Sequence, residues 1–306
     1  MEVFADSADE LMQWRSRAAS GDGEASRWLA IVAASGAGVP HDLPAALGHL
    51  QQAAEQGCRA AQSELAALVG NWRLVAELAA GEALRAGMAE RLRAAVDLVA
   101  WLRLPDGEVF SEAPRIAVAR KFISPQHCDW LIRLGTPHLR AAQIYEPSGN
   151  LAEDLRRTNR AALLELAQTD TVLAFVRSRV AALANVKIAG LEGSQVLHYE
   201  VGQEFRPHHD FYDVANPVHA REVARAGQRA LTVLIYLNDG YEGGHTAFPL
   251  LGRSFKGRKG DALLFWNVGE DGTSDARTLH TGTAPTRGEK WLFSQWVRIA
   301  MPPRAS

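Results

Sequence analysis

The stretch "ALTVLIYLN", residues 230–238, is a nearly continuous apolar run of strand length that contains β-branched residues. Such runs are typical of strands buried in a sheet. Similar runs flank it: "QVLHYEV" (195–201), "DALLFWNV" (261–268) and "KWLFSQWVRI" (290–299). Glycine-rich turns such as "YEGGH" (241–245) and "KGRKGD" (256–261) separate them. Short strands with such turns predict a β-sandwich or barrel, here with helices packed outside.

The first 104 residues differ from this pattern, because they are rich in Ala, Leu, Glu and Arg with apolar residues at helical spacing. They also repeat at an offset of 36 positions: Ala18, Gly21, Ala25, Leu29 and Ala30 recur as Ala54, Gly57, Ala61, Leu65 and Ala66. A fixed period of about 20 to 50 residues indicates stacked helical hairpins. The segment "SGAGVPHDLPAALGHLQQAAEQG" (35–57) resembles the Sel-like repeat, a relative of the tetratricopeptide repeat.

Three ranges are expected along the chain: a helical repeat region at 1–104, a linker at 105–112 and a second domain at 113–302. A helical run from about 72 to 104 ends at "LPDGEVFSEAPR", whose Pro, Gly and Ser mark a boundary. In the second domain, Ser124 and Pro125 begin one helix, and another spans about 170–184. The repeat region is interpreted either as a helical cap or as a peptide-binding module, with equal weight.

Net charge and cysteine content limit the possible binding partners and the cellular compartment. The net charge of −2 gives no overall field that favours nucleic acid, so no nucleic-acid partner is expected. Cys58 and Cys128 are too few for a disulfide framework, which is typical of a reducing compartment. The sequence shows neither a signal peptide nor the roughly 18 consecutive apolar residues of a membrane span. We therefore expect a soluble, cytoplasmic protein with no membrane partner.

Two His-x-Asp triplets are candidate metal-binding pairs. His127 and Asp129 fall early in the helix that Ser124 caps, where residues two apart are about 200° apart around the axis. His208 and Asp210, in "RPHHDFYD" (206–213), follow a β-type run, in which residues two apart project from the same face. Geometry therefore favours the second triplet.

A third ligand must come from elsewhere, and the candidates are His219, His245 and His280. Two histidines and one carboxylate form the facial triad of non-haem Fe(II) oxygenases, which leaves positions open for substrates. We choose His280, because a turn follows it and Lys290 then stands on a strand. A cation at that place can pair with the distant carboxylate of a 2-oxoacid that chelates the iron.

At this point a family resemblance is clear. Residues 113 to 300 resemble the prolyl 4-hydroxylase branch of the Fe(II)- and 2-oxoglutarate-dependent dioxygenases. The similarity runs in order through "ISPQHCDWLI", "RRTN", "LHYEVGQEFRPHHDFYD", "GQRALTVLIYLNDGYEGGHTAFP", "KGDALLFWN" and "LHTGTAPTRGEKWLFSQW". The resemblance implies an α+β chain: helical repeats followed by a double-stranded β-helix, or jelly roll, with supporting helices.

The resemblance also implies residue roles. His208, Asp210 and His280 would bind Fe(2+), and Lys290 would hold the distal carboxylate of the cosubstrate 2-oxoglutarate. O2 is the other substrate, and L-ascorbate is expected as an accessory cofactor. A further group matches positions around the cosubstrate pocket: Tyr199, Thr232 and Trp296.

Substrate contacts are the least specified part of the resemblance. Arg157, Asn159 and Arg160 correspond to a segment that borders the substrate groove in relatives. His245 stands where close relatives usually carry Glu, which puts the identity of the substrate in question. The connection from 213 to 228 is a second candidate cover over the substrate.

The expected function is hydroxylation of a peptidyl residue, foremost proline, with release of succinate and CO2. Because this scaffold also hydroxylates free amino acids and small metabolites, a small-molecule hydroxylase is one alternative. The other alternative is a protein-interaction scaffold whose barrel has lost catalysis.

Overall fold

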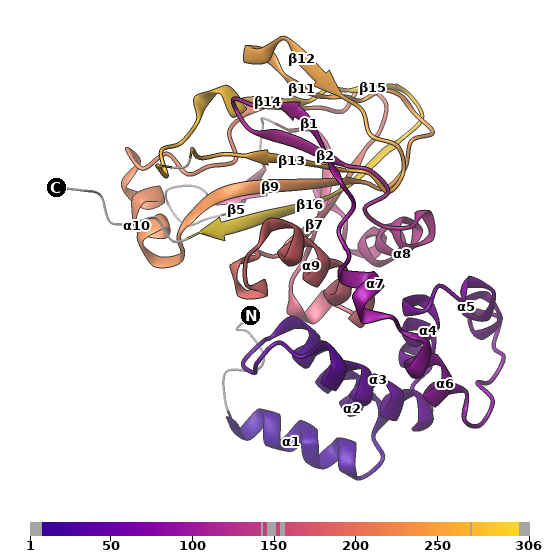
Figure 1. Cartoon of the computed structure of the whole chain (residues 1–306). Helices are drawn as coiled ribbons and strands as arrows, with labels where there is room; N and C mark the ends of the chain where they lie inside the picture. The colour runs from indigo at the N-terminus through magenta and orange to yellow at the C-terminus, as the bar shows by residue number, and fades with distance from the viewer. Residues whose placement is uncertain (1–7, 142, 146–150, 154–156, 270, 300–306) are drawn as a thin grey trace. The chain divides into compact units, whose positions relative to one another are not determined.

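The computed structural model describes residues 8–141, 143–145, 151–153, 157–269 and 271–299. The chain forms two compact units (Figure 1). One comprises Met1–Leu104 and Glu165–Ala189, and the other Pro105–Leu164 and Gly190–Ser306. The chain therefore leaves the second unit after residue 164 and returns to it at residue 190.

The first unit is helical. Its helices are α1 (Ala8–Ala19), α2 (Gly23–Ser35), α3 (Leu43–Glu55), α4 (Arg59–Leu68), α5 (Trp72–Ala79), α6 (Met88–Ala95), α7 (Leu98–Leu102) and α9 (Thr171–Ala184). Several begin where a short polar side chain accepts a hydrogen bond from the N–H three residues on, as Asp22, Asp42 and Asp170 do. Such caps pair an N–H that the helix itself leaves unsatisfied.

The positions that repeat at an offset of 36 are structurally equivalent. Gly21, between α1 and α2, and Gly57, between α3 and α4, both have positive φ, +95° and +88°. The repeated alanines and leucines on either side of these turns are all buried. The sequence repeat thus corresponds to two helical hairpins with the same turn and the same buried positions.

The expected single helical run from 72 to 104 is wrong. The structure divides it into α5, α6 and α7. Gly81 and Gly87 take positive φ values of +102° and +69°, which right-handed helices do not tolerate, and Asp97 caps a new helix at Leu98.

Helix α9 matches the helix expected at 170–184, and it belongs to the helical unit. Buried Glu64 of α4 accepts hydrogen bonds from the Thr171 backbone N–H at 3.1 Å and from its hydroxyl at 2.6 Å. The same carboxylate pairs with Arg27 of α2 at 2.6 Å. One carboxylate therefore joins three helices that are far apart in sequence.

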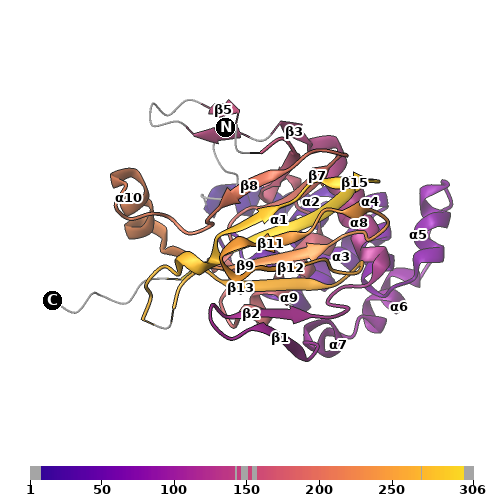
Figure 2. The same cartoon turned by 90° about the horizontal axis from the view of Figure 1, so that it is seen from above.

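The second unit is built on antiparallel sheets. The larger, seen from above in Figure 2, has the order β1-β2-β13-β9-β16-β7-β6-β3. Its strands are β1 (Gly107–Ser111), β2 (Ile116–Ala119), β3 (Arg140–Ala141), β6 (Arg160–Leu164), β7 (Ser194–Tyr199), β9 (Gln228–Tyr236), β13 (Ala262–Trp266) and β16 (Lys290–Ile299). The four apolar runs of the sequence are thus β7, β9, β13 and β16, which adjoin one another in this sheet. Helix α8 (Pro125–Gly135) starts at its expected cap, Ser124.

A smaller sheet has the order β12-β11-β14-β8 and lies above β13, β9 and β16 in Figure 1. Its strands are β8 (Phe205–His208), β11 (Thr246–Phe248), β12 (Arg253–Phe255) and β14 (His280–Gly282). Buried side chains of both sheets form one core, including Tyr236 and Phe265 from the larger and Phe248 and Phe255 from the smaller. Two antiparallel sheets around a shared core are consistent with the expected jelly roll.

The remaining elements are two strand pairs, β4 (Gln143–Tyr145) with β5 (Leu151–Glu153) and β10 (Glu242–Gly243) with β15 (Pro285–Arg287), and helix α10 (Pro217–Ala226).

The predicted linker at 105–112 contains edge strand β1, whose mostly exposed residues gave no apolar pattern. The domain boundaries at 104 and 113 stay a prediction.

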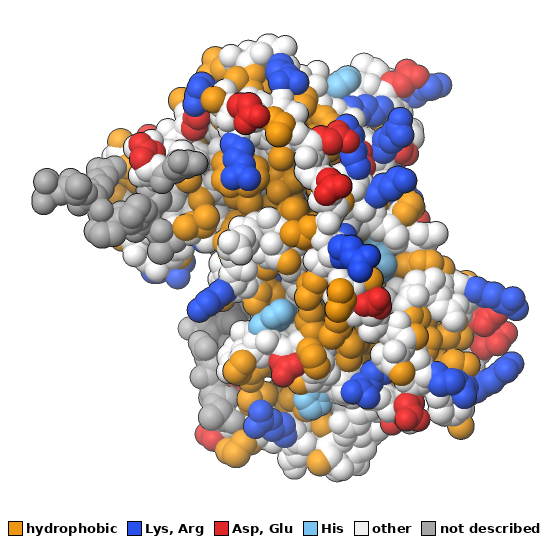
Figure 3. Space-filling view, in the orientation of Figure 1, with side chains coloured by type: hydrophobic (Ala, Val, Ile, Leu, Met, Phe, Trp, Pro, Cys, Tyr) orange, Lys and Arg blue, Asp and Glu red, His pale blue; other side chains and the backbone are white. Residues whose placement is uncertain are grey.

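The surface carries both signs of charge. On the face drawn in Figure 3, acidic and basic side chains are interspersed over the described residues. In the described part of the chain, no helix has the length and apolar character needed to cross a membrane.

Candidate active site

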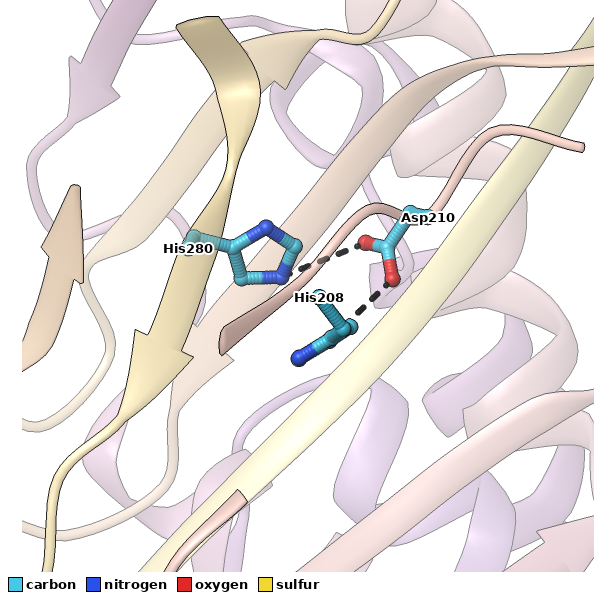
Figure 4. Close-up of side chains that lie close together, drawn as sticks. All are labelled: His208, Asp210 and His280. Atoms are coloured by element: carbon cyan, nitrogen blue, oxygen red, sulfur yellow. Dashed lines mark ion pairs between the residues drawn. The ribbon is translucent and has the colours of Figure 1, made fainter. Parts of the chain in front are cut away.

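His208, Asp210 and His280 converge between the two sheets. His208 ends β8 and pairs with His280, the first residue of β14, in the antiparallel register. Asp210 follows two residues later, with Oδ1 3.5 Å from His208 Nε2 and Oδ2 3.6 Å from His280 Nε2 (Figure 4). One ligand atom from each lies within 4.8 Å of the others. Two imidazole nitrogens and one carboxylate oxygen are the donor set of a facial triad.

Backbone carbonyls fix the orientation of both imidazoles. His208 Nδ1 lies 2.7 Å from the Arg206 carbonyl oxygen, and His280 Nδ1 lies 3.0 Å from that of Thr278. When Nδ1–H donates to these oxygens, the lone pair of Nε2 faces Asp210. Burial, followed by the nearby His208, lowers the pKa of His280 to about 4, which keeps it in the neutral form that metals bind.

Asp210 is held in the ionised form and in one orientation. Burial alone would raise its pKa, but the His280 and His208 imidazoles together hold the pKa of this carboxyl below its usual range. The Thr232 hydroxyl donates to Asp210 Oδ2 at 2.7 Å. Asn267 in turn donates to the Thr232 hydroxyl at 2.9 Å. Thr232 lies against the carboxylate and is not among the residues that line the pocket.

The neighbour of the triad in sequence, His209, points away from it. Its side chain is exposed, and Nε2 lies 3.0 Å from the Ala276 carbonyl oxygen. Pro207 lies in β8, which is an edge strand, as expected of a residue that has no N–H to donate.

Lys290 is fully buried and lines the same pocket as the triad. Its Nζ has no hydrogen-bond partner among the described residues and lies 5.0 Å from the Tyr199 ring centroid. Burial, followed by the charge of Lys256, lowers the pKa of Lys290 to about 7. A buried cation without a partner is costly, so the site fits a ligand that brings an anion.

The pocket wall combines apolar and aromatic side chains with about as many polar and charged ones. It is lined by Arg157, Gln195, Leu197, Tyr199, Phe205, His208, Asp210, Leu234, Thr246, His280, Gly282, Lys290, Leu292, Ser294 and Trp296. Phe205 stacks on the His208 ring with centroids 3.4 Å apart, and Phe265 packs 4.6 Å from His280. These rings keep solvent from two sides of the triad.

Two pocket residues, Thr246 and Gly282, escaped the sequence reasoning. Thr246 lines the pocket, and its hydroxyl lies 2.8 Å from the hydroxyl of Tyr236. A Cβ on Gly282 would lie 3.3 Å from the Tyr199 hydroxyl, so the glycine leaves space there. Only the strand register reveals these neighbours, because β9, β11 and β14 are separate in sequence.

Of the residues predicted around the cosubstrate, Tyr199 and Trp296 line the pocket. Tyr199 faces Lys290 across the β7–β16 register, and Trp296 faces Thr232 across the β16–β9 register. The Trp296 ring stacks with the Arg229 guanidinium at 3.5 Å.

The predicted substrate residues are not all brought to the pocket. Arg157 lines it, with its guanidinium 5.0 Å from the Phe205 ring centroid. Asn159 is buried and donates to the Arg160 carbonyl oxygen at 2.9 Å. Arg160 pairs with His198, so it shares the sheet face opposite to Leu197 and Tyr199, which line the pocket.

His245 is half-buried and lies outside the described group of metal-ligating side chains. Its backbone N–H donates to the Thr283 hydroxyl at 2.8 Å. Burial, followed by the charges of Lys256 and Lys290, lowers its pKa.

Comparisons with known proteins show which family this chain resembles. The model of the 2OG-Fe(II) oxygenase superfamily matches residues 194–298. Prolyl 4-hydroxylase 1 of Arabidopsis thaliana is 35% identical over 207 residues, 62% of this chain and 71% of the relative. Probable prolyl 4-hydroxylase 3 of the same plant is 34% identical over 212 residues, 63% of this chain and 72% of the relative. The crystal structure of a viral collagen prolyl hydroxylase from Paramecium bursaria Chlorella virus-1, in its 2-oxoglutarate complex, aligns at a TM-score of 0.46 with 24% identity, covering 60% of this chain and 95% of that one.

The fold and the site therefore define an iron- and 2-oxoglutarate-dependent oxygenase. The chain belongs to the 2OG-Fe(II) oxygenase superfamily and is a prolyl hydroxylase-like dioxygenase. Membership implies Fe(2+), 2-oxoglutarate and O2 as the reacting groups.

Proposed function

We propose that this enzyme hydroxylates a prolyl residue within a peptide or protein, with His208, Asp210 and His280 as the Fe(2+) ligands. The observation that carries this proposal is Lys290 Nζ, which has no hydrogen-bond partner among the residues that the structure describes and lies in the pocket that the three ligands line. A 2-oxoacid that chelates iron and carries a second carboxylate satisfies both features at once.

Iron held by these three residues would supply the oxidative chemistry, in which O2 and 2-oxoglutarate yield succinate, CO2 and a hydroxylated product. The protein residues position the reactants. Thr232 fixes the rotation of the Asp210 carboxylate, and the carbonyls of Arg206 and Thr278 fix the two imidazoles. Tyr199 and Thr246 contribute hydroxyl-bearing side chains to the wall of the same pocket.

A peptide substrate is supported by the names of the relatives, which are prolyl 4-hydroxylases. Arg157 is the predicted substrate residue that lines the pocket, so it is the first candidate for contact with a peptide. A free amino acid or another small molecule is the competing substrate class, and its own carboxylate would also pair with an arginine.

The test is an incubation with Fe(II), 2-oxoglutarate and L-ascorbate, in which succinate release and the mass of the acceptor are followed. The acceptors are a poly-L-proline peptide, free L-proline, and a matched peptide with alanine in place of proline. The proposal predicts a gain of one oxygen on the proline peptide alone. Oxygen added to free L-proline but not to the peptide would favour the hypothesis of a small-molecule substrate.

L-Ascorbate belongs to the proposal as the reductant that returns oxidised iron to Fe(II). Omitting it should lower the number of turnovers per enzyme without changing the initial rate. An initial rate that vanishes without ascorbate would instead make it an obligatory reactant.

The helical unit is proposed to consist of Sel-like repeats that either cap the catalytic unit or bind a partner peptide. The equivalent turns at Gly21 and Gly57 support the repeat. A cytoplasmic location is proposed as well, since both described cysteines are buried and unpaired. Fractionation of the host cell, with this chain followed by antibody, tests the location.

A further inference from the structure

Glu192 holds two arginines at the end of the central strands β9 and β16. Its carboxylate accepts two hydrogen bonds from Arg229, at 2.7 and 2.8 Å, and one from Arg298 at 2.5 Å. All three side chains are largely buried, with exposed fractions of 18%, 17% and 11%. Charge-assisted hydrogen bonds in such surroundings are among the stronger polar contacts in proteins.

The carboxylate is needed because the two arginines face each other. Arg229 and Arg298 are direct cross-strand partners, next to a register irregularity in β16. Like charges directly opposite one another destabilise a sheet. Glu192 offsets this repulsion, and Arg229 then stacks on Trp296, a pocket residue, at 3.5 Å.

Arg298 also reaches helix α10. Its guanidinium donates to Glu222 of α10 at 2.9 Å and to the carbonyl oxygen of Gly227, at the end of α10, at 2.9 Å. A third hydrogen bond, at 3.2 Å, goes to the hydroxyl of Tyr212, which stands two residues after Asp210. One side chain therefore connects the segment after the metal ligand with the helix that follows it.

Tyr212 completes the connection to the pocket wall. Its ring lies 4.6 Å from the Arg229 guanidinium and 4.8 Å from that of Arg298. Its backbone N–H and carbonyl exchange hydrogen bonds with the Gln228 side chain, both at 2.8 Å. The contacts thus run from Trp296 through Arg229, Tyr212 and Arg298 to Glu222.

Helix α10 is attached by these polar contacts and by the ring of His219, which packs edge-on against Tyr212 with centroids 5.1 Å apart. None of the residues of α10 is buried. Val218 in the helix is 50% exposed, and Val214 just before the helix is 42% exposed. Without an apolar face in a core, a helix of 10 residues is only marginally stable in water.

We propose that Arg298 is a positioning residue that fastens α10 to the Trp296 wall of the pocket, and that this attachment is required for binding a peptide substrate but not 2-oxoglutarate. The predicted effect on the KM for the peptide rests on the proposed peptide hydroxylation. The attachment itself follows from the contacts of Arg298 alone.

Two measurements on the full-length protein test this role. The first is hydrogen–deuterium exchange of the peptide that covers α10, in the wild type, Arg298→Gln, Arg298→Lys and Glu222→Gln. The second is the separate KM of each variant for poly-L-proline and for 2-oxoglutarate. The matched control is Arg287→Gln, which removes an arginine from an exposed ion pair with Glu242.

Arg298→Gln should speed exchange in α10 about tenfold or more and raise the KM for poly-L-proline by a similar factor, because it removes the charge-assisted hydrogen bonds to Glu192 and Glu222. Lysine should not restore either value, because one ammonium cannot serve Glu192, Glu222 and Gly227 together. Glu222→Gln should shift exchange in the same direction. The control should leave both quantities within about twofold.

Unchanged exchange in α10 of Arg298→Gln would overturn the proposal, as would an equal rise in the KM for 2-oxoglutarate, which indicates general loosening of the pocket. If the wild type does not turn over the proline peptide, the proposed substrate is wrong. The exchange measurement then still decides whether Arg298 fastens α10.

Discussion

Lys290 and Tyr199 face each other across β16 and β7, and the Lys290 ammonium lies 5.0 Å from the centre of the Tyr199 ring. A cation near an aromatic face gains about 0.5 to 2 kcal/mol, much less than full burial of a charge costs. The described residues offer Nζ no hydrogen bond. The pocket therefore contains a buried positive charge that is suited to pair with an anionic ligand.

The first prediction concerns stability. Lys290→Met should raise the free energy of unfolding of the metal-free protein by about 1 to 4 kcal/mol, because it replaces an unpaired buried charge with an apolar side chain of similar length. Urea unfolding checks the value. A variant less stable than the wild type would mean that Lys290 already has a partner.

The second prediction is a pH dependence of that stability difference. The pKa of Lys290 falls from 10.5 to about 7 in the folded protein, so between these values the unfolded chain binds more protons. Wild-type stability should therefore gain from this group as pH rises from about 7 to 10, and the advantage of Lys290→Met should shrink over the same range. Unfolding curves at pH 6, 8 and 9.5 measure the difference. A difference that is constant with pH would contradict the lowered pKa.

Thr232 provides a third prediction. Thr232→Val keeps the side-chain shape but removes the hydrogen bond to Asp210, so Fe(II) affinity should fall about tenfold or more, as is usual when a group that orients a ligand is lost. Anaerobic Fe(II) titration measures this. His209→Ala is the control, since His209 is exposed, and its affinity should equal that of the wild type. Equal losses in both variants would show that Thr232 has no special role.

Gly282 supplies a fourth prediction. Gly282→Ala adds a Cβ 3.3 Å from the Tyr199 hydroxyl, so the KM for 2-oxoglutarate should rise about tenfold through crowding of the pocket. Gly240→Ala meets nothing within 4 Å and serves as the control. An unchanged KM in Gly282→Ala would place the cosubstrate away from Tyr199.

A fifth prediction concerns the helical unit. Glu64→Ala removes the partner of Arg27 and of Thr171 and should lower the free energy of unfolding by about 3 to 5 kcal/mol. Urea unfolding followed by circular dichroism checks it. Glu77→Ala breaks the exposed pair with Arg73 and should leave the midpoint of urea unfolding almost unchanged. Similar small losses in both would mean that Glu64 does not hold the helices together.

The strands and the site were predictable to different degrees. Four apolar runs identified the central strands, because burial on both faces removes polar residues from such segments. His208 and Asp210 were found as a candidate pair because they stand two apart after a β-type run. His280 is 70 positions beyond Asp210, so short-range geometry does not fix it; it was chosen among three histidines because Lys290 follows it by ten residues.

Features that depend on register were not predictable. Nothing in the sequence shows that the hydroxyl of Thr232 meets Asp210, or that Arg229 faces Arg298, since these contacts join distant strands. The same holds for Glu64, whose contact with Thr171 spans 107 positions of the chain. Arg160 stands close in sequence to Arg157, yet strand alternation puts it on the other face of the sheet.

The most direct measurement compares two cosubstrates in anaerobic, Fe(II)-loaded protein. 2-Oxoglutarate and 2-oxopentanoate share the iron-chelating head and the chain length, but only the former carries the distal carboxylate. If Lys290 receives that carboxylate, the wild type should bind 2-oxoglutarate at least about a hundredfold more tightly, and Lys290→Ala should bind both with nearly equal, weak affinity. A variant that still prefers 2-oxoglutarate by a hundredfold would contradict the assignment of Lys290 and, with it, the orientation of the cosubstrate in the pocket.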